Sequence, residues 1–243
     1  MSELARGSSG STRILIVGHG RMGALVERLA PECGCDVAGV LDIDQNVHGE
    51  GLADGAWRDV DVAIDFTTAA AVRDNLPRYA ALGLNVVVGT TGWTADRGAL
   101  GDLAARAGIG VVAAPNFSVG AVLFESMAAH AAGLLARHPE FGAWLHELHH
   151  DKKLDAPSGT ALGIEAAMKA AGYARTIDVA SSRAGHVPGV HTIGFDGPSE
   201  TITLSHSVRD RGTFARGALL AARWVKGRRG WFTMRDVLEG KSG

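Results

Sequence analysis

Short apolar runs alternate with amphipathic stretches through the first 115 residues of the chain. The apolar runs are rich in β-branched residues and end in glycine or polar residues, which predicts buried strands. These strands are expected over 13–18, 36–41, 60–66, 84–89 and 109–114. Helical composition lies between them, over 24–31, 69–82 and 94–107, and Pro77 is expected to shape or end the second helix. This alternation predicts a parallel sheet covered by helices.

The pattern changes after residue 116. One long helix is expected over 119–136, and a second helix follows a Pro-Ser-Gly-Thr turn over 159–171. Strands are predicted over 142–148, 177–183, 190–195 and 200–208. Because the last three strands follow one another without helices, their sheet should be antiparallel or mixed. A helix over 214–226 and a short tail over 231–238 complete the prediction.

Composition and charge exclude several classes of protein. The 243 residues, 46% of them hydrophobic, can bury the core of one large domain or two small ones. A formal net charge of −2 offers no basic field for nucleic acid or lipid. No apolar run approaches the roughly 20 residues of a membrane span, and the opening segment lacks the apolar middle of a secretion signal. We therefore expect a cytoplasmic protein without nucleic-acid or membrane partners.

The two cysteines, Cys33 and Cys35, stand one residue apart. In an extended strand their side chains would point the same way, about 7 Å apart, which is too far to bridge. We interpret them as reduced thiols, as is usual inside cells.

A glycine-rich turn follows the first predicted strand. Gly18, Gly20 and Gly23 match the first, third and sixth places of a dinucleotide-binding fingerprint, and a predicted helix begins within it. Such a turn must be tight, must let the backbone approach a pyrophosphate, and must pack the helix closely on the sheet. The context predicts a Rossmann-type nucleotide domain, whereas the glycine pattern alone would also fit a turn without a ligand.

Asp42 ends the second predicted strand, 24 residues after Gly18. A carboxylate at this place can accept hydrogen bonds from both ribose hydroxyls of an adenosine and would repel a 2′-phosphate. The next residue, Ile43, provides no compensating cation. The pattern favours NADH over NADPH, although Arg21 in the turn leaves use of both open.

Two further segments stand after predicted strands of the parallel sheet, Gly-Thr-Thr-Gly at 89–92 and Ala-Pro-Asn-Phe at 114–117. Ligands in such sheets lie outside the carboxyl ends of the strands. Small hydroxyls, an amide and exposed backbone suit a nicotinamide ribose and carboxamide. Asn and Thr are also ordinary turn residues, so neither segment is decisive alone.

The densest group of reactive side chains lies at 147–161, Glu-Leu-His-His-Asp-Lys-Lys-Leu-Asp-Ala-Pro-Ser-Gly-Thr-Ala. Histidine can give or take a proton near neutral pH, and lysine supplies a positive charge. The start of the following helix offers unpaired N–H groups to an anion. The run therefore predicts a site for a small acidic substrate. The turn by itself would equally fit a polar loop before a capped helix.

Together these segments resemble the bacterial 4-hydroxy-tetrahydrodipicolinate reductase family, also called dihydrodipicolinate reductase, of lysine and diaminopimelate synthesis. The matching segments extend from Ile14 to Leu238, and the block at 149–161 is the most specific of them. The other matches lie at 20–23, 64–67, 89–92, 115–120, 183–185, 191–192, 213–218 and 234–238.

The resemblance implies reduction of 4-hydroxy-tetrahydrodipicolinate by NADH or NADPH, with loss of water and no metal. His149 matches the proton donor, and Lys153 matches a second catalytic group that positions and polarises the substrate. The implied substrate contacts are His150, Ser158, Gly159, Thr160 and Arg211. The implied nucleotide contacts are Gly18, His19, Gly20, Arg21, Met22, Gly23, Asp42, Gly89, Thr90, Thr91, Ala114, Pro115, Asn116 and Phe117.

The resemblance also implies the architecture. We expect an α/β protein with a Rossmann-type parallel-sheet nucleotide domain, 1–117 and 212–243. A smaller α+β domain with a mixed sheet, 118–211, would bind the small dicarboxylate substrate and build a homotetramer. The site should form between these domains, which are expected to close on binding.

The chain departs from the family pattern in three places. Its glycine turn is one residue shorter than the common form, which changes how the loop would grip a pyrophosphate. Ile43 follows Asp42, where an acidic–basic pair is frequent, and the stretch before Arg183 is short.

Other classes of protein fit the sequence less well. A semialdehyde dehydrogenase needs a cysteine nucleophile near the nicotinamide, but Cys33 and Cys35 flank the second strand. A sugar dehydrogenase needs no lysine-and-helix site for a dianion, and a nucleotide-sensing module usually carries a DNA-binding segment. A metal hydrolase needs clustered ligands, and only His146, His149 and His150 are neighbours in sequence. His191 and His206 lie in predicted strands, where packing is the default.

Overall fold

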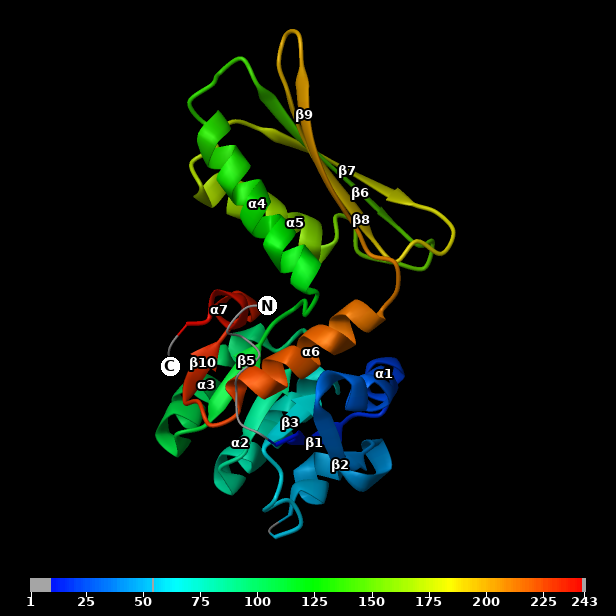
Figure 1. The fold of residues 1–243 in the computed structure, drawn as a ribbon, viewed down its shortest axis with the longest axis vertical. Coiled ribbons are helices and arrows are strands. Elements are labelled where there is room, and N and C mark those ends of the chain that lie inside the picture. Colours follow the sequence, from blue (N-terminus) through cyan, green and yellow to red (C-terminus); the bar gives the residue numbers. More distant parts are fainter. Residues whose placement is uncertain (1–9, 54, 242–243) are drawn as a thin grey trace. The chain divides into compact units, whose positions relative to one another are not determined.

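The structure is a computed structural model of the 243-residue chain and describes residues 10–53 and 55–241. The chain divides into two compact units (Figure 1). Unit 1 comprises the residues up to Phe117 and those from Phe214 onward, and unit 2 comprises Ser118–Thr213. Within the described residues, no helix combines the length and apolar character that a membrane span needs.

Unit 1 contains a six-stranded parallel sheet in the order β10-β5-β4-β3-β1-β2. Its strands are β1 (Thr12–Val17), β2 (Cys35–Leu41), β3 (Val62–Asp65), β4 (Asn85–Val88), β5 (Gly110–Ala113) and β10 (Gly230–Phe232). Its helices are α1 (Arg21–Leu29), α2 (Ala69–Leu82), α3 (Arg97–Ala107), α6 (Gly212–Val225, which begins in unit 2) and α7 (Met234–Glu239). Short 3-10 helices span Pro31–Cys33, Ile43–Gln45, Val47–Leu52 and Thr94–Asp96.

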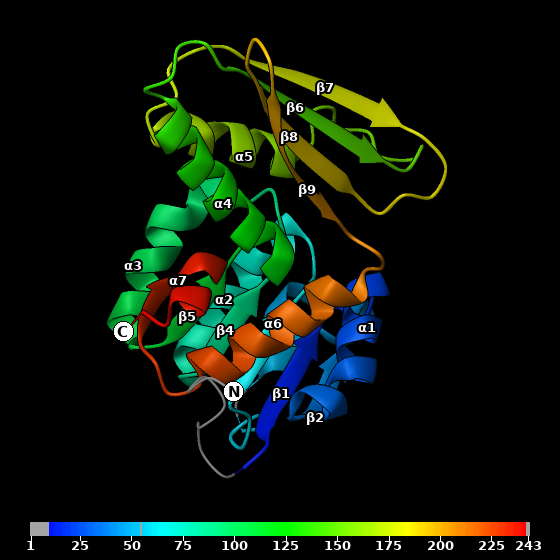
Figure 2. The same cartoon turned by 45° about the horizontal axis from the view of Figure 1, so that its top comes forward.

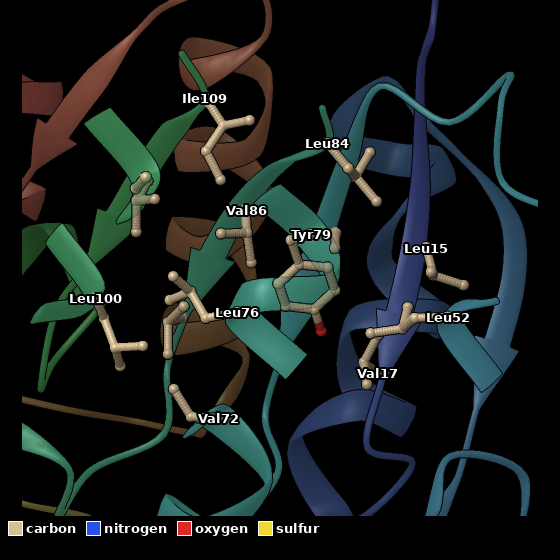
Figure 3. Packing of buried hydrophobic residues seen from close by; sticks show 14 of the residues in the cluster. Leu15, Val17, Leu52, Val72, Leu76, Tyr79, Leu84, Val86, Leu100 and Ile109 are labelled. Carbon is tan, nitrogen blue, oxygen red and sulfur yellow. The ribbon is translucent and has the colours of Figure 1, made fainter. Parts of the chain in front are cut away.

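Helices cover both faces of this sheet, which explains why its strands read as continuous apolar runs. On one face, Leu76 and Tyr79 of α2 and Leu100 of α3 pack beside Val86 of β4 (Figure 3). On the other face α1 approaches so closely that a Cβ at Gly23 would lie 3.4 Å from the Ile16 side chain. The carboxyl ends of the parallel strands therefore meet at one edge, where the loops after β1, β3 and β4 begin.

The helix predicted over 69–82 is confirmed as α2, and Pro77 does not end it, because buried residues on either side, such as Leu76 and Tyr79, hold the helix by packing. Two local expectations for unit 1 need correction. The tail adds strand β10 beside β5, and its three residues were too few to show a periodicity. Cys33 ends a 3-10 helix, not a strand, and Gly34 follows with φ 70°, while both thiols are free.

Unit 2 contains a four-stranded mixed sheet in the order β7-β6-β8-β9. Its elements are α4 (Val119–Leu135), β6 (Gly142–His149), α5 (Gly159–Ala170), β7 (Ile177–Arg183), β8 (Val190–Asp196) and β9 (Thr201–Ser207). Strand β6 runs parallel to β7 and antiparallel to β8, so the predicted mixed sheet is confirmed. Both helices lie on the same face of the sheet (Figure 2).

Burial alternates along β6, as expected for a strand covered on one face. Ala143 and Leu145 point into the apolar core that α4 and α5 complete. Glu147 and His149 continue the same buried series. Two ionisable side chains therefore share a strand face with the hydrophobic core, and the fold must satisfy or use their polar atoms.

Candidate functional site

The three glycines of the turn after β1 have different physical roles. Gly18 has φ 88°, and a Cβ there would lie 2.5 Å from the carbonyl oxygen of Phe66. A Cβ at Gly23 would lie 2.1 Å from the carbonyl oxygen of Gly18. At Gly20 a Cβ would meet nothing within 4 Å. The fold thus requires two of the glycines, while the third leaves open space at the start of α1.

The start of α1 suits an anion. Gly20 is its N-cap residue and provides no side-chain cap, and the first turn holds no acidic residue. Arg21 is exposed and Met22 half-buried, so a cation stands beside the free helix end. Because N–H groups at a helix start attract phosphate, this segment fits the pyrophosphate of a dinucleotide.

The carboxylate of Asp42 lies beside this turn, at the carboxyl end of β2. The His19 backbone N–H donates to Asp42 Oδ1 at 3.2 Å, while the His19 ring lies 2.7 Å from Glu27. Backbone hydrogen bonds from Ile43 and His19 lower the pKa of Asp42, which is exposed. An ionised carboxylate therefore stands where the sequence predicted a ribose contact.

The loops after β3 and β4 are held together by a buried aspartate. Asp65 is fully buried and accepts hydrogen bonds from Thr67, Asn75 and Tyr79. The Thr67 backbone N–H also donates to Thr90 Oγ1 at 2.8 Å. Burial raises the pKa of Asp65, although these hydrogen bonds oppose it. Asp65 is not among the predicted site residues, although an acidic side chain inside an apolar strand is a signal for it.

The remaining predicted nucleotide contacts line the same strand ends. A Cβ at Gly89 would lie 2.1 Å from the Phe66 ring, and Thr91 is exposed. After β5, Ala114 and Phe117 are buried, with the Phe117 ring edge-on to Phe66 at 6.3 Å, while Pro115 is exposed and Asn116 half-buried.

In unit 2, a lysine and a helix start together hold a carboxylate. Lys153 Nζ donates to both oxygens of Asp155, at 2.7 and 3.0 Å. The Lys153 ammonium, and to a smaller degree the Gly159 backbone N–H, lower the pKa of Asp155. A Cβ at Gly159 would meet nothing within 4 Å, so the space at the start of α5 is open. We call Lys153 and the start of α5 the anion cradle.

The register of the sheet gathers a second group around Glu147. Glu147 pairs with Ser181 on β7 and with His191 on β8, and His149 pairs with Arg183. Glu147 Oε1 accepts three hydrogen bonds, from Ser158 N at 3.0 Å, Ser181 Oγ at 2.8 Å and Arg183 Nη2 at 2.8 Å. Burial alone would raise the pKa of Glu147, but these hydrogen bonds bring it down to about 2.

The other oxygen of Glu147 faces two buried histidines. Oε2 lies 3.0 Å from His149 Nδ1 and 3.8 Å from His191 Nε2, and the two rings are edge-on at 5.2 Å. Burial lowers the pKa of His149, and the Glu147 carboxylate opposes that shift. Burial and the neighbouring His149 lower the pKa of His191 to about 4.

The predicted residues of unit 2 divide into three groups. His149, Lys153 and Gly159 come to the carboxyl end of β6 and the start of α5. Ser158 caps α5 through Oγ and donates its N–H to Glu147, so both polar groups are used inside the protein. The third group, His150, Thr160 and Arg211, is half-buried. The substrate contacts of these residues remain predictions.

The histidines are arranged differently from their order in the sequence. His146 lies on the opposite face of β6 from His149, 3.0 Å from Ser182 Oγ, because strand neighbours alternate. His206 stacks on Phe124 at 5.8 Å. His191 instead lies beside His149 and Glu147. One possible ligand atom from each of the three side chains lies within 4.8 Å of the other two, which is close enough to hold a metal ion. The expectation that no metal binds therefore stays a prediction.

Two family models match nearly the whole chain. The model described as dihydrodipicolinate reductase, N-terminus, matches residues 12–117, and that described as dihydrodipicolinate reductase, C-terminus, matches residues 120–238. The chain belongs to the dihydrodipicolinate reductase family. The family and fold class expected from the sequence are thereby confirmed. Reductases of this family use a nicotinamide cofactor.

Relatives in the dihydrodipicolinate reductase family cover the chain almost completely. The 4-hydroxy-tetrahydrodipicolinate reductase of Thiobacillus denitrificans is 38% identical, over 94% of this chain and 98% of that protein. The protein of the same name from Archaeoglobus fulgidus is 37% identical, over 90% of this chain and 96% of that protein. A dipicolinate-bound dihydrodipicolinate reductase from Paenisporosarcina sp. TG-14 has the same fold, with a TM-score of 0.77 and 24% identity over 92% of this chain and 97% of that chain.

Proposed function

We propose that this chain reduces 4-hydroxy-tetrahydrodipicolinate to tetrahydrodipicolinate, with loss of water, in lysine and diaminopimelate synthesis. The observation that carries the proposal is the anion cradle, which already holds the Asp155 carboxylate through Lys153, whose charge also acts on the buried His149. A carboxylate of a small dicarboxylic substrate can take the place of Asp155. The activity named for the sequence relatives supports this choice of substrate.

The cradle suits a dianion because it combines a cation with helix N–H groups. Charge-assisted hydrogen bonds of this kind are short and directional. Lys153 and Gly159 would hold one carboxylate, and His150, Ser158, Thr160 and Arg211 are the further contacts that the resemblance implies. The side chain of Lys153, 24% exposed, must exchange Asp155 for the substrate.

His149 is the proposed proton donor. When bound, a reduced nicotinamide supplies a hydride to a ring carbon of the substrate, and a proton must reach the adjacent position. His149 would donate that proton from its ring and regain one from water, while Lys153 positions and polarises the substrate. General acid catalysis of this kind contributes about 10²–10⁴-fold to the rate.

Unit 1 is the proposed nucleotide domain. The open space at Gly20 and the uncapped start of α1 fit a pyrophosphate. Asp42 fits the adenosine ribose, and the exposed residues at the ends of β4 and β5 fit the nicotinamide side. Because Asp42 is ionised and Ile43 offers no cation, we propose that NADH is preferred over NADPH.

A coupled assay tests the function. A synthase would make the substrate from pyruvate and aspartate semialdehyde, and oxidation of NADH and NADPH would be followed separately. We expect turnover with both cofactors and higher kcat/KM with NADH. No oxidation of either cofactor would overturn the proposed activity, whereas a preference for NADPH would overturn only the role given to Asp42.

His149→Gln tests the acid within the same assay. We expect kcat to fall about 10²–10⁴-fold while the Kd for NADH, measured by fluorescence, stays unchanged. His146→Gln is the matched control, since it removes a histidine from the opposite face of the same strand. Full turnover by His149→Gln would contradict the proton-donor role.

We also propose that the chain forms a homotetramer through the sheet of unit 2, as the resemblance implied. On β9, the side chain of Ile202 is 44% exposed, which leaves apolar surface on this sheet for a second copy. Light scattering coupled to size-exclusion chromatography gives the mass directly. A monomer at micromolar concentration would contradict this assembly.

A further inference from the structure

We infer that Glu147 is a positioning residue for proton transfer: its Oε2 holds Nδ1–H of His149 and leaves Nε2 as the atom that donates the proton. This inference rests on the proposed role of His149 as the acid. Neither Glu147 nor its partner Arg183 is among the residues predicted to take part in the reaction.

The carboxylate of Glu147 is fixed in orientation. Its Oε1 accepts three hydrogen bonds from two segments: one from the Ser158 backbone N–H at the start of α5, and two from the Ser181 and Arg183 side chains on β7. One donor is a guanidinium, so the carboxylate is ionised inside the protein. A rotation that moved Oε2 away from the histidines would break all three bonds. All three hydrogen bonds therefore go to Oε1, and they hold Oε2 in a fixed position beside the histidines.

The second oxygen and the histidine are both short of partners. Among the described residues, Glu147 Oε2 and His149 Nδ1 have no hydrogen-bond partner of good geometry, although they lie only 3.0 Å apart. A buried polar atom without a hydrogen-bond partner destabilises the fold. A hydrogen bond between Oε2 and Nδ1–H would satisfy both atoms. Catalytic hydrogen bonds are often poorly aligned without substrate and tighten when it binds. A small turn of the imidazole completes this bond.

The other ring nitrogen of His149 faces a backbone without a side chain. A Cβ at Gly189 would lie 3.0 Å from Nε2. Because residue 189 is a glycine, no side chain is placed against Nε2, and 7% of His149 remains exposed. When one ring nitrogen binds a carboxylate, the tautomer is fixed and the other nitrogen is available for chemistry.

The charges around His149 also support a role for Glu147 in proton transfer. Glu147 from β6 is the anion that favours the imidazolium. Arg183 from β7, together with Lys153 and His150 from the loop after β6, disfavours it. His191 from β8 faces the same ring edge-on and stays neutral, its pKa lowered to about 4. Removal of the negative charge would leave only groups that oppose protonation of the acid.

Glu147→Gln tests the inference through its pH profile. An acid must be protonated to act, so kcat falls as pH rises through the pKa of His149. Loss of the carboxylate lowers that pKa, and we expect the fall to begin at lower pH, with kcat reduced about 10–100-fold near neutrality. KM should change much less, because the anion cradle is intact. Glu147→Asp, which keeps the charge, should recover part of the rate.

Glu165→Gln is the matched control. It makes the same substitution in unit 2, at a half-buried glutamate that pairs with Lys169 at 2.9 Å, and should leave kcat and its pH profile unchanged. Inactivity of His149→Gln together with a wild-type rate and profile for Glu147→Gln would overturn the inference and keep the proposed function. Full activity of His149→Gln would instead remove the proposed acid itself.

The position of the proton in the unmodified protein tests the inference without a variant at Glu147. In protein labelled with ¹⁵N-histidine, long-range ¹H–¹⁵N spectra distinguish the two neutral tautomers, and the spectrum of His149→Gln identifies the signals of His149. We expect neutral His149 to carry its proton on Nδ1. A proton on Nε2 in the neutral form, with and without dipicolinate, would overturn the inference.

Discussion

Each unit of the protein has a fully buried carboxylate on a strand, and the two are satisfied differently. Asp65 in unit 1 receives hydrogen bonds on both oxygens, all from neutral donors, and burial raises its pKa. Glu147 in unit 2 receives three bonds on one oxygen, one of them from Arg183, and its pKa falls to about 2. A carboxylate that accepts hydrogen bonds on both oxygens, as Asp65 does, is typical of a structural role. A carboxylate that is fixed through one oxygen, as Glu147 is, can accept a hydrogen bond from a neighbouring side chain with the other.

The difference follows from where each side chain points. Asp65 lies at the end of β3 and joins α2 to the loops after β3 and β4, so its partners are those it must hold in place. Glu147 lies within two residues of the end of β6, next to the histidine at that end. We therefore expect loss of Asp65 to affect stability and loss of Glu147 to affect turnover.

The largest effect on stability is expected from Asp65→Asn. The amide turns one acceptor into a donor that faces Thr67, Asn75 or Tyr79, so at least one buried donor loses its partner. This should lower the free energy of unfolding by about 2–3 kcal/mol, measured by urea denaturation. Asp96→Asn, at a partly exposed residue paired with Arg73, is the control and should cost less than about 1 kcal/mol. Equal costs for both variants would break the comparison.

The two carboxylates should also give stability opposite dependences on pH. The lowered pKa of Glu147 stabilises the fold above about 4.5, and this contribution is lost as pH falls towards about 2. The raised pKa of Asp65 has the other sign, since its contribution is present below 3.8 and is lost as pH rises through the folded-state pKa.

Urea unfolding at a series of pH values checks these signs. As pH falls from about 7 to about 3, the cost of Glu147→Gln should shrink and the cost of Asp65→Asn should grow. If both costs changed in the same direction with pH, the opposite pKa shifts of Glu147 and Asp65 would be contradicted.

A smaller effect is expected from Asp155→Ala, which removes the internal carboxylate from the anion cradle. Exposed ion pairs contribute at most about 1 kcal/mol, so dipicolinate should bind up to about five-fold more tightly by calorimetry. Asp151→Ala, in the same loop, is the control and should leave the affinity unchanged. Weaker binding by Asp155→Ala would show that Asp155 organises the cradle and does not compete for it.

The sequence was sufficient for both sheets, because their strands have clear apolar patterns. It was also sufficient for the glycine turn, whose spacing carries the geometry of close packing at Gly18 and Gly23. It failed for β10, whose three residues carry no periodicity, and it left open whether Pro77 would end α2, which burial of the helix prevents.

The group around Glu147 could not be read from the sequence for a different reason. His191 stands 44 positions after Glu147 in the chain, and only the register of β6 with β8 makes them opposite each other. Alternation along β6 could have separated His146 from His149 and placed Glu147 beside His149. Which residues of other strands complete the group depends on pairing, which no local pattern encodes.

Turnover per folded molecule, compared between Glu147→Gln and Asp65→Asn in the coupled assay, tests the central claim most directly. Folded protein would be counted from the unfolding curve of each variant. The account predicts a loss of about 10–100-fold for Glu147→Gln and less than about three-fold for Asp65→Asn. Equal losses, or a larger loss for Asp65→Asn, would contradict it.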